Sequence, residues 1–263
     1  MGIKASDIIA EIEKSYPRSL AMSWDNPGLI CGHYDKEINK VLIALDADNH
    51  TVDKALELNV DMILTHHPMI FGSIKQINDA DFLGRKLLKL IENGICCYAM
   101  HTNFDIASEG MGDIVAERLG IASLSPLEKT YEQAGKKSLG IGFIGDLAEP
   151  MTVKELSLLV KEKFKLSSAW FYDAGRTVKR IAVCPGSGKG MMDEVKASGA
   201  DVFITGDTGH HDGLDYIDAG VSLIDAGHFG LEHVFADKMN NFLAARFPTL
   251  ETALEVTDER QFI

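Results

Sequence analysis

The stretch Asp61-Met-Ile-Leu-Thr-His-His-Pro68 decides the fold, because a short apolar run ends directly in two histidines. Such a run, bounded by polar residues, indicates a buried β-strand. Similar runs occupy residues 41–46 and 95–100, and helical patterns occupy 52–58 and 81–92 between them. Strands that alternate with helices predict an α/β fold with mixed, mostly parallel sheets and right-handed crossovers.

The second half of the chain repeats this scheme. Asp201-Val-Phe-Ile-Thr205 resembles Asp61-Met-Ile-Leu-Thr65, and in both halves the third strand runs into a histidine with a carboxylate four residues later. The recurrence of chemical residues, and not only of apolar residues, favours an internal duplication. The expected strands here are 180–184, 201–205 and 221–224, and the expected helices are 191–198 and 211–218.

The remaining patterns set the expected domain organisation. Helices are predicted at 6–15 with Ser6 as N-cap, and at 111–119, 151–164 and 231–245. Strands are predicted at 138–145 and 168–172. Residues 121–137 are the best candidate for a linker. We therefore expect an N-terminal α/β lobe of residues 1–128, which residues 229–263 could complete, and a C-terminal α/β lobe of residues 129–263.

The net charge, the apolar runs and the cysteines of the chain indicate which kinds of partner and compartment to expect. The 263 residues carry a net charge of −13, from 39 acidic and 26 basic residues. This argues against nucleic acid as a main partner, because phosphate binding depends on clustered Lys and Arg. It leaves room for a nucleotide substrate, since metal ions neutralise phosphates locally. No apolar run approaches the roughly 20 residues of a membrane span. The four cysteines form no C-x-x-C pair, as expected of reduced thiols in a cytoplasmic protein.

Histidines and carboxylates gather at the predicted strand ends, where α/β proteins bind ligands. His66 and His67 follow one strand, and Pro68 forces a turn that can aim both rings into one cleft. His101-Thr-Asn-Phe-Asp105 follows the next strand, and His228-Phe-Gly-Leu-Glu232 opens a helix. Taken singly, the histidines could be surface residues and the acids helix caps or first-turn residues.

The combination of these residues favours a metal site. Mixed imidazole and carboxylate ligands suit Zn, Fe, Mn, Ni or Co better than Ca or Mg. Five or six ligands are too many for one tetrahedral Zn and suit two divalent ions about 3.5–4 Å apart. Two such ions make water nucleophilic at neutral pH, so the reaction class that follows is hydrolysis.

Other polar residues near these strand ends have more than one possible role. Asp207 occupies the repeat position that matches the histidine pair, and it could act as a base, contact substrate or serve only turn chemistry. His210 and His211 could orient substrate or transfer protons. Pro185-Gly-Ser-Gly-Lys-Gly190 could cradle an anion or be an ordinary tight turn. Our catalytic candidates are His101, Asp207 and His210.

Five segments together resemble the Nif-three-like family, whose members are also called GTP cyclohydrolase 1 type 2 homologs or domain of unknown function 34. They are Trp24-Asp-Asn-Pro-Gly-Leu29, Thr65-His-His-Pro68, His101-Thr-Asn-Phe-Asp105, Thr205-Gly-Asp207 and Gly227-His-Phe-Gly-Leu-Glu232. The resemblance implies two related α/β lobes with a dinuclear metal site in the cleft between them, and a homohexameric toroid. The family's metal ligands fall on His66, His67, Asp105, His228 and Glu232. His101 matches a histidine that lines the site.

The resemblance implies a dinuclear metal-dependent hydrolase, similar to GTP cyclohydrolase 1 type 2, that acts on a nucleotide-like or other small substrate. Two other functions fit the same residues. One is a non-catalytic metal-binding protein, such as a metal chaperone or store. The other is a regulatory scaffold. The expected partners are a small molecule and further copies of the chain, without a membrane or nucleic acid.

Overall fold

The protein is a mixed α/β structure, seen here in a computed structural model that describes residues 2–132 and 138–261. Its contacts divide the chain into two compact units. Unit 1 consists of residues 1–104 and 235–257, and unit 2 consists of residues 105–234 and 258–263. Within the described ranges, no helix has both the length and the apolar character that crossing a membrane requires.

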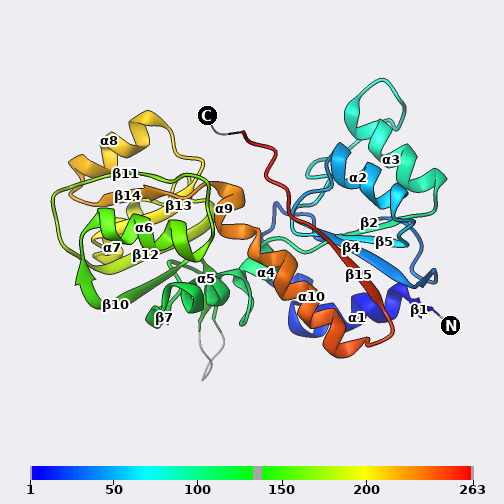
Figure 1. Cartoon of the computed structure of the whole chain (residues 1–263), viewed down its shortest axis with the longest axis horizontal. Helices are drawn as coiled ribbons and strands as arrows, with labels where there is room; N and C mark the ends of the chain where they lie inside the picture. The colour runs from blue at the N-terminus through cyan, green and yellow to red at the C-terminus, as the bar shows by residue number, and fades with distance from the viewer. Residues whose placement is uncertain (1, 133–137, 262–263) are drawn as a thin grey trace. The chain divides into compact units, whose positions relative to one another are not determined.

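Unit 1 is built on a five-stranded sheet of order β15-β4-β5-β6-β2. The strands are β2 (Gly28–Cys31), β4 (Lys40–Ala44), β5 (Met62–Thr65), β6 (Cys96–Ala99) and β15 (Glu251–Glu255). All neighbours are parallel except β2, which runs antiparallel to β6. In Figure 1, helices lie on both sides of this sheet. They are α2 (Asn49–Glu57) and α3 (Phe82–Glu92) on one side, and α1 (Ala5–Ser15) and α10 (Val234–Arg246) on the other.

The core of unit 1 follows from the apolar character of its central strands. Leu42, Ile63 and Cys97 lie on the three parallel strands and are fully buried. They belong to one cluster with Val52 of α2 and Leu90 of α3. Fully burying a side chain of this size stabilises the fold by about 1.5–3 kcal/mol. This packing fixes the carboxyl ends of β5 and β6, where the histidines begin.

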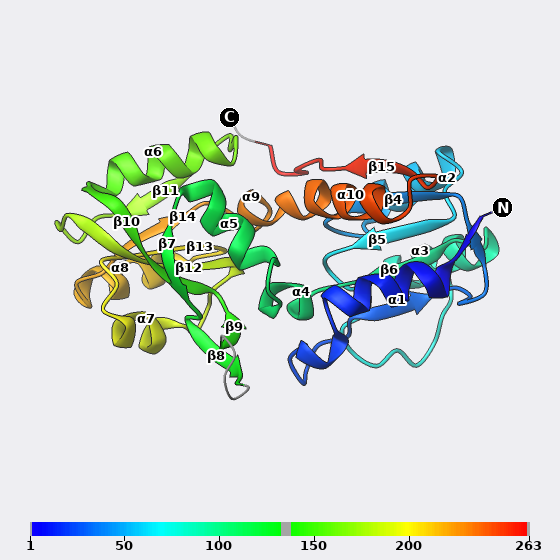
Figure 2. The same cartoon turned by 90° about the horizontal axis from the view of Figure 1, so that it is seen from below.

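Unit 2 carries a six-stranded sheet of order β11-β14-β13-β12-β10-β7. The strands are β7 (Ala122–Ser125), β10 (Phe143–Met151), β11 (Trp170–Tyr172), β12 (Val178–Ser187), β13 (Val202–Gly206) and β14 (Ser222–Asp225). The three central strands β12, β13 and β14 are parallel, and the others are antiparallel to their neighbours. In Figure 2, α6 lies on one side of this sheet, and α7 and α8 lie on the other. The helices of unit 2 are α5 (Met111–Leu119), α6 (Val153–Lys163), α7 (Met192–Ser198), α8 (His210–Asp218) and α9 (His228–Glu232).

The two units share a repeated strand register. Met62 of β5 pairs with β4 and β6 in the same way as Val202 of β13 pairs with β12 and β14. Asp61 accepts hydrogen bonds at 2.8 and 3.3 Å from two main-chain N–H groups where β4 begins. Asp201 accepts two such bonds from β12, both at 2.9 Å. The same side chain therefore has the same task in both units, which supports the internal duplication.

Several predicted elements need correction. Residues 121–137 are not simply a linker, because they contain β7 and β8 (Glu128–Tyr131), although residues 133–137 lie outside the described residues. Ser6 is not the N-cap of α1, which begins at Ala5 after Lys4. The strand expected at 138–145 is two strands, β9 (Leu139–Ile141) and β10, separated by a left-handed Gly142 with φ 62°. The small elements β1 (Ile3–Lys4), β3 (Glu37–Ile38), a 3-10 turn (Arg18–Leu20) and the strands β2 and β15 were not predicted.

The four cysteines, Cys31, Cys96, Cys97 and Cys184, are all free thiols. Burial, with a smaller contribution from Cys96, raises the pKa of Cys31 to about 11. Burial likewise raises the pKa of Cys97 and Cys184. Because only a thiolate is a good nucleophile or ligand, these side chains act as small apolar residues.

Candidate metal-binding residues

The histidine pair of unit 1 lies in a tight turn after β5. His67 N–H donates to the Leu45 carbonyl at 3.0 Å, and the Thr65 hydroxyl donates to the His67 carbonyl at 2.8 Å. These bonds hold the chain out of the extended form that would send adjacent side chains to opposite faces. The two imidazole rings lie 4.9 Å apart between centroids, and His66 is fully buried.

His101, which follows β6, completes a three-histidine cluster in unit 1. Its ring centroid lies 5.2 Å from that of His66 and 5.4 Å from that of His67. Each of the three residues offers a ring nitrogen, and these nitrogens all lie within 4.8 Å of one another. Imidazole nitrogens at this spacing could hold a divalent transition-metal ion.

An oxygen atom occupies the Nδ1 side of every ring in the cluster. The acceptors are the Met100 carbonyl for His66 at 2.9 Å, Asp46 for His67 at 2.9 Å and Asp25 for His101 at 2.8 Å. Because a carbonyl or an ionised carboxylate can only accept, each Nδ1 donates its proton and each Nε2 keeps the lone pair that a metal needs. The donor set therefore fits a metal bound through Nε2.

The side chain of Asp25 is 0% exposed, whereas that of Asp46 is 55% exposed. Asp25 also accepts from Thr102 N–H at 3.0 Å and from the Thr102 hydroxyl at 2.5 Å. Burial pushes the pKa of Asp25 upward, but the hydrogen bonds from His101 and Thr102 outweigh it and lower the pKa to about 2. Asp25 is therefore an anion at neutral pH.

Neither Asp25 nor Asp46 was among our predicted site residues. Asp46 is the last residue of the strand predicted at 41–46, so the strand-end signal could have found it. Asp25 stands in the Trp24–Leu29 turn, where nothing local points to chemistry. Its role depends on contacts with residues 76 and 77 positions away.

Unit 2 carries a second group of polar residues around α9. His228 Nε2 lies 3.0 Å from Glu232 Oε2, as expected for a spacing of four on one helix face. His228 Nδ1 donates to Asp207 at 2.7 Å. Glu232 is almost fully buried. Asp105 lies in α4 (Thr102–Ile106). Burial is the main cause that raises the pKa of the Cys184 thiol, and the negative charges of Asp105 and Glu232 raise it further.

Two glycines make room for this second group. A Cβ on Gly186, whose φ is 71°, would lie 2.2 Å from Glu232 Oε1 and 3.3 Å from His228 Nε2. A Cβ on Gly206 would lie 2.4 Å from the main-chain nitrogen of His228. The glycine-rich segment that begins at the end of β12 therefore allows the close approach of a carboxylate and an imidazole, a use of glycine that the sequence pattern alone did not reveal.

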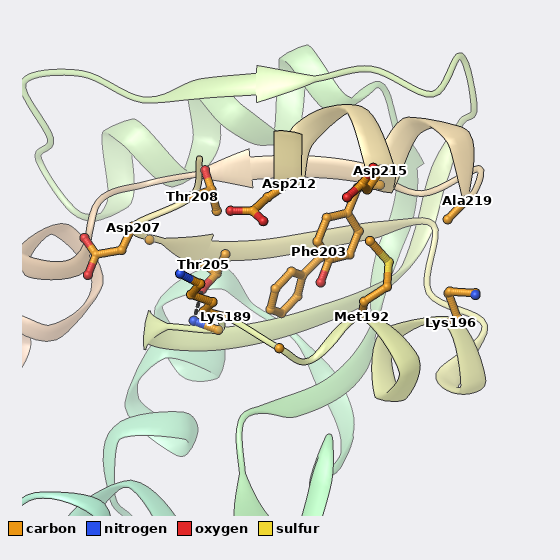
Figure 3. A pocket seen from close by; sticks show the side chains of 14 residues that line it. Lys189, Met192, Lys196, Phe203, Thr205, Asp207, Thr208, Asp212, Asp215 and Ala219 are labelled. Carbon is orange, nitrogen blue, oxygen red and sulfur yellow. Dashed lines mark hydrogen bonds between the residues drawn. The ribbon is translucent and has the colours of Figure 1, made fainter. Parts of the chain in front are cut away.

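Asp207 links His228 to a pocket in unit 2. The pocket has a volume of about 330 Å³ and is lined by 14 residues, which come from β13, α7, α8, the residues just after β13 and α8, and the glycine-rich turn. Figure 3 shows Asp207 at one end of it, away from Phe203 and Met192. Asp207 has φ 59°, a left-handed backbone that a side chain with a Cβ adopts only at a cost. Such conformations cluster at functional sites.

His210 and His211 stand apart from both groups. They begin α8, are exposed, and lie 5.3 Å from each other between ring centroids. Among the described residues, the groups that could hold a metal include neither of them. The catalytic roles of His101, Asp207 and His210 therefore stay predictions.

Comparisons with known proteins place these residues in a family context. A sequence model described as Duf34/NIF3 (NGG1p interacting factor 3) matches residues 3–261. A GTP cyclohydrolase 1 type 2 homolog of Clostridium acetobutylicum is 38% identical over 233 residues, which cover 88% of this chain and 86% of the relative.

Solved structures agree with the sequence matches. A hypothetical protein of Staphylococcus aureus superposes with a TM-score of 0.89 at 29% identity and full coverage of both chains. Reduced HcgD from Methanocaldococcus jannaschii gives 0.84 at 30% identity, over 97% of this chain and 98% of its own. The α/β fold and the resemblance predicted from the sequence are thus confirmed.

Proposed function

Because the chain belongs to the Duf34/NIF3 family, we propose that it is a metal-dependent hydrolase with two divalent transition-metal ions. The proposed ligands are His66, His67, Asp105, His228 and Glu232. The observation that carries the proposal is the three-histidine cluster of unit 1, in which ring nitrogens converge within 4.8 Å while an oxygen holds each Nδ1. Surface histidines have no need of such orientation, whereas metal ligands regularly show it.

The chemistry divides between the metals and the side chains around them. Bound divalent ions would lower the pKa of water and neutralise charge that develops on the substrate. His101 is suited to accept a proton at Nε2, because anionic Asp25 on Nδ1 stabilises the imidazolium that results. Asp207 orients His228 in the same manner. We propose that His210, which is exposed at the start of α8, contacts substrate.

We propose a nucleotide-like substrate. The support is the name of the relatives, GTP cyclohydrolase 1 type 2 homolog, at 36–38% identity in two Clostridium species. A net charge of −13 makes local neutralisation by metal the natural way to hold a polyphosphate. Hydrolytic opening of the purine ring leaves a formamide, and a second water would hydrolyse it to release formate, whereas hydrolysis of a phosphoanhydride bond would release phosphate.

Metal content per chain is the first test. Elemental analysis of the purified protein should give about two divalent ions per chain, and His66→Ala and Glu232→Ala should each lose at least one. His33→Ala is the matched control, because His33 is exposed and lies outside the metal-capable groups of the described residues. Equal metal content in all variants would refute the site.

Turnover is the second test. Formate and phosphate release from GTP should require the metal, should stop in His67→Ala and should persist in His33→Ala. Full metal content without turnover across a panel of nucleotides would favour a non-catalytic metal-binding protein. Partner capture that is unchanged in Glu232→Ala would favour a regulatory scaffold.

We further propose a homohexamer and a cytoplasmic location. The hexamer rests on the family resemblance, and light scattering on the purified protein should give six times the 28.8 kDa mass of the chain. The location is supported by the four free thiols, which suit a reducing compartment. Fractionation of cells should recover the chain with the cytoplasmic proteins.

A further inference from the structure

Two large aromatic side chains of unit 1 remain exposed beside the histidine cluster. Trp24 is 58% exposed and Phe71 is 51% exposed. Single exposed apolar residues need no explanation, but these two contact the same imidazole. The His101 ring centroid lies 6.0 Å from that of Trp24 and 5.6 Å from that of Phe71, both at steep interplanar angles of 72° and 80°.

Hydrogen bonds on both sides hold the segment that carries Trp24. On one side, Met22 N–H donates to the Thr102 hydroxyl at 2.9 Å. On the other side, buried Asp25 accepts from both His101 and Thr102. The backbone of Trp24 is thus tied, through its neighbours, to the residues that follow β6. An exposed ring on a fixed backbone loses little entropy when a ligand stacks on it.

A further hydrogen bond ties the Phe71 loop to the Trp24 loop. The Asn26 side-chain amide donates to the Ile70 carbonyl at 2.8 Å. Asn26 and Ile70 lie close in sequence to the two rings, at two positions and one position away. Three consecutive residues therefore have three tasks. Trp24 supplies one ring, Asp25 holds His101, and Asn26 fastens the loop that carries Phe71.

From this arrangement, we infer that Trp24 and Phe71 form a stacking site for the planar heteroaromatic ring of the substrate, next to His101. Aromatic faces bind such rings with little sequence or side-group preference, which suits a nucleobase. The choice of a nucleobase rests on the proposed function, but the stacking itself requires no metal. A sugar phosphate without a base would gain nothing from the two rings.

Tryptophan fluorescence can read this site directly. The chain has two tryptophans, so Trp170→Phe leaves Trp24 as the single emitter. In metal-free Trp170→Phe protein, GMP should quench the emission with saturation, and ribose 5-phosphate should not. Phe71→Ala should weaken GMP binding about tenfold or more, and Phe71→Tyr should restore it.

Equilibrium dialysis with GMP extends the test to Trp24 itself. Trp24→Ala should weaken binding about tenfold or more, while Trp24→Phe should keep most of it. Phe82→Ala is the control, because Phe82 lies in the same unit and is 65% exposed. Unchanged GMP binding in Trp24→Ala and Phe71→Ala would overturn the inference. So would a change in oligomeric mass with unchanged binding, since the rings would then belong to an interface between copies.

The tests of the stacking site can fail or succeed independently of the tests of the hydrolase. Metal analysis and product release test the hydrolase, whereas the stacking measurements use protein without metal. Quenching by GMP without any hydrolysis would keep the stacking site and reject the hydrolase. Hydrolysis of GTP that is unaffected by both alanine variants, with no quenching by GMP, would keep the hydrolase and reject the stacking site.

Discussion

Asp25 Oδ1 accepts a hydrogen bond of 2.8 Å from His101 Nδ1, and the Asp25 side chain is closed to solvent. Because Asp25 also accepts two bonds from Thr102, one side chain fixes both the imidazole and the first residue of α4. The orientation of the His101 ring thus depends on Asp25, which is not itself one of the proposed metal ligands.

Asp25→Ala should destabilise the fold by about 1–3 kcal/mol, because buried N–H groups lose their acceptor. It should also slow turnover about 100-fold, because His101 loses the anion that orients it and stabilises its imidazolium. Urea unfolding and product release from GTP measure the two effects. Asp35→Ala, at an exposed position, should change neither. Unaltered turnover in Asp25→Ala would mean that His101 takes no part in the reaction.

Asp207→Asn separates orientation from backbone strain. Asparagine tolerates the left-handed backbone at φ 59°, so stability should stay within about 0.5 kcal/mol. The lost negative charge behind His228 should weaken metal binding about tenfold or more. Calorimetric titration with Zn²⁺ or Co²⁺ reads the affinity. Asp215→Asn is the control, since Asp215 lines the same pocket on the exposed side of α8. Equal affinities for the two variants would contradict the role of Asp207.

Gly186→Ala tests the close approach of Glu232. The new Cβ would meet Glu232 Oε1 at 2.2 Å, so the carboxylate must move and metal content should fall by at least one ion per chain. Gly190→Ala is the matched control on the same turn, with φ 91° and open space around an added Cβ. Both variants lose about 1–3 kcal/mol of stability to backbone strain. Only Gly186→Ala should lose metal, and loss in both would show that general loosening of the turn is the cause.

Glu255 gives unit 1 a predictable response to acid. Burial raises its pKa, but hydrogen bonds from Lys54 at 2.6 Å and Thr257 at 2.8 Å outweigh this and lower it to about 2. The folded carboxyl therefore holds its charge below the unfolded value of about 4.3. The stabilisation is complete above that value and is lost as the pH falls from about 4.3 toward 2.

Glu255→Gln should lower stability at pH 7 by about 1–3 kcal/mol, because Lys54 loses a charged partner. The gap between wild type and variant should shrink as the pH falls from 5 to 2. Urea unfolding at several pH values measures the gap. Glu251→Gln, on the exposed face of the same strand, is the control. A gap that stays constant across this range would show that the charge of Glu255 is not linked to folding.

The predictable part of the fold was the part with strong local patterns. The strands β5 and β13 contain continuous apolar runs, and α5 occupies the predicted residues 111–119 because Gly110 and Gly120 bound it. In contrast, β15 is only five residues long, and its sequence Glu-Thr-Ala-Leu-Glu has neither a continuous apolar run nor a polar–apolar alternation. Its place in the sheet depends on pairing with β4, whose sequence lies about 200 residues earlier.

The same distinction applies to the site. Histidines at strand ends could be recognised because strand ends are local features. The acids behind them could not all be recognised, since the bond between Asp25 and His101 joins positions 76 apart. The clearance at Gly186 was likewise hidden, because it depends on Glu232 in a different element.

The division of the chain has a consequence for biosynthesis. Most of unit 2 is one continuous segment, whereas unit 1 recruits α10 and β15 from residues 235–257. A ribosome delivers about 5–20 residues per second, so unit 2 can reach its native form while unit 1 still lacks its last strand. Until β15 arrives, one side of β4 exposes unpaired backbone groups, which are a template for pairing with other chains. Nascent unit 1 is therefore where chaperone protection matters most for this protein.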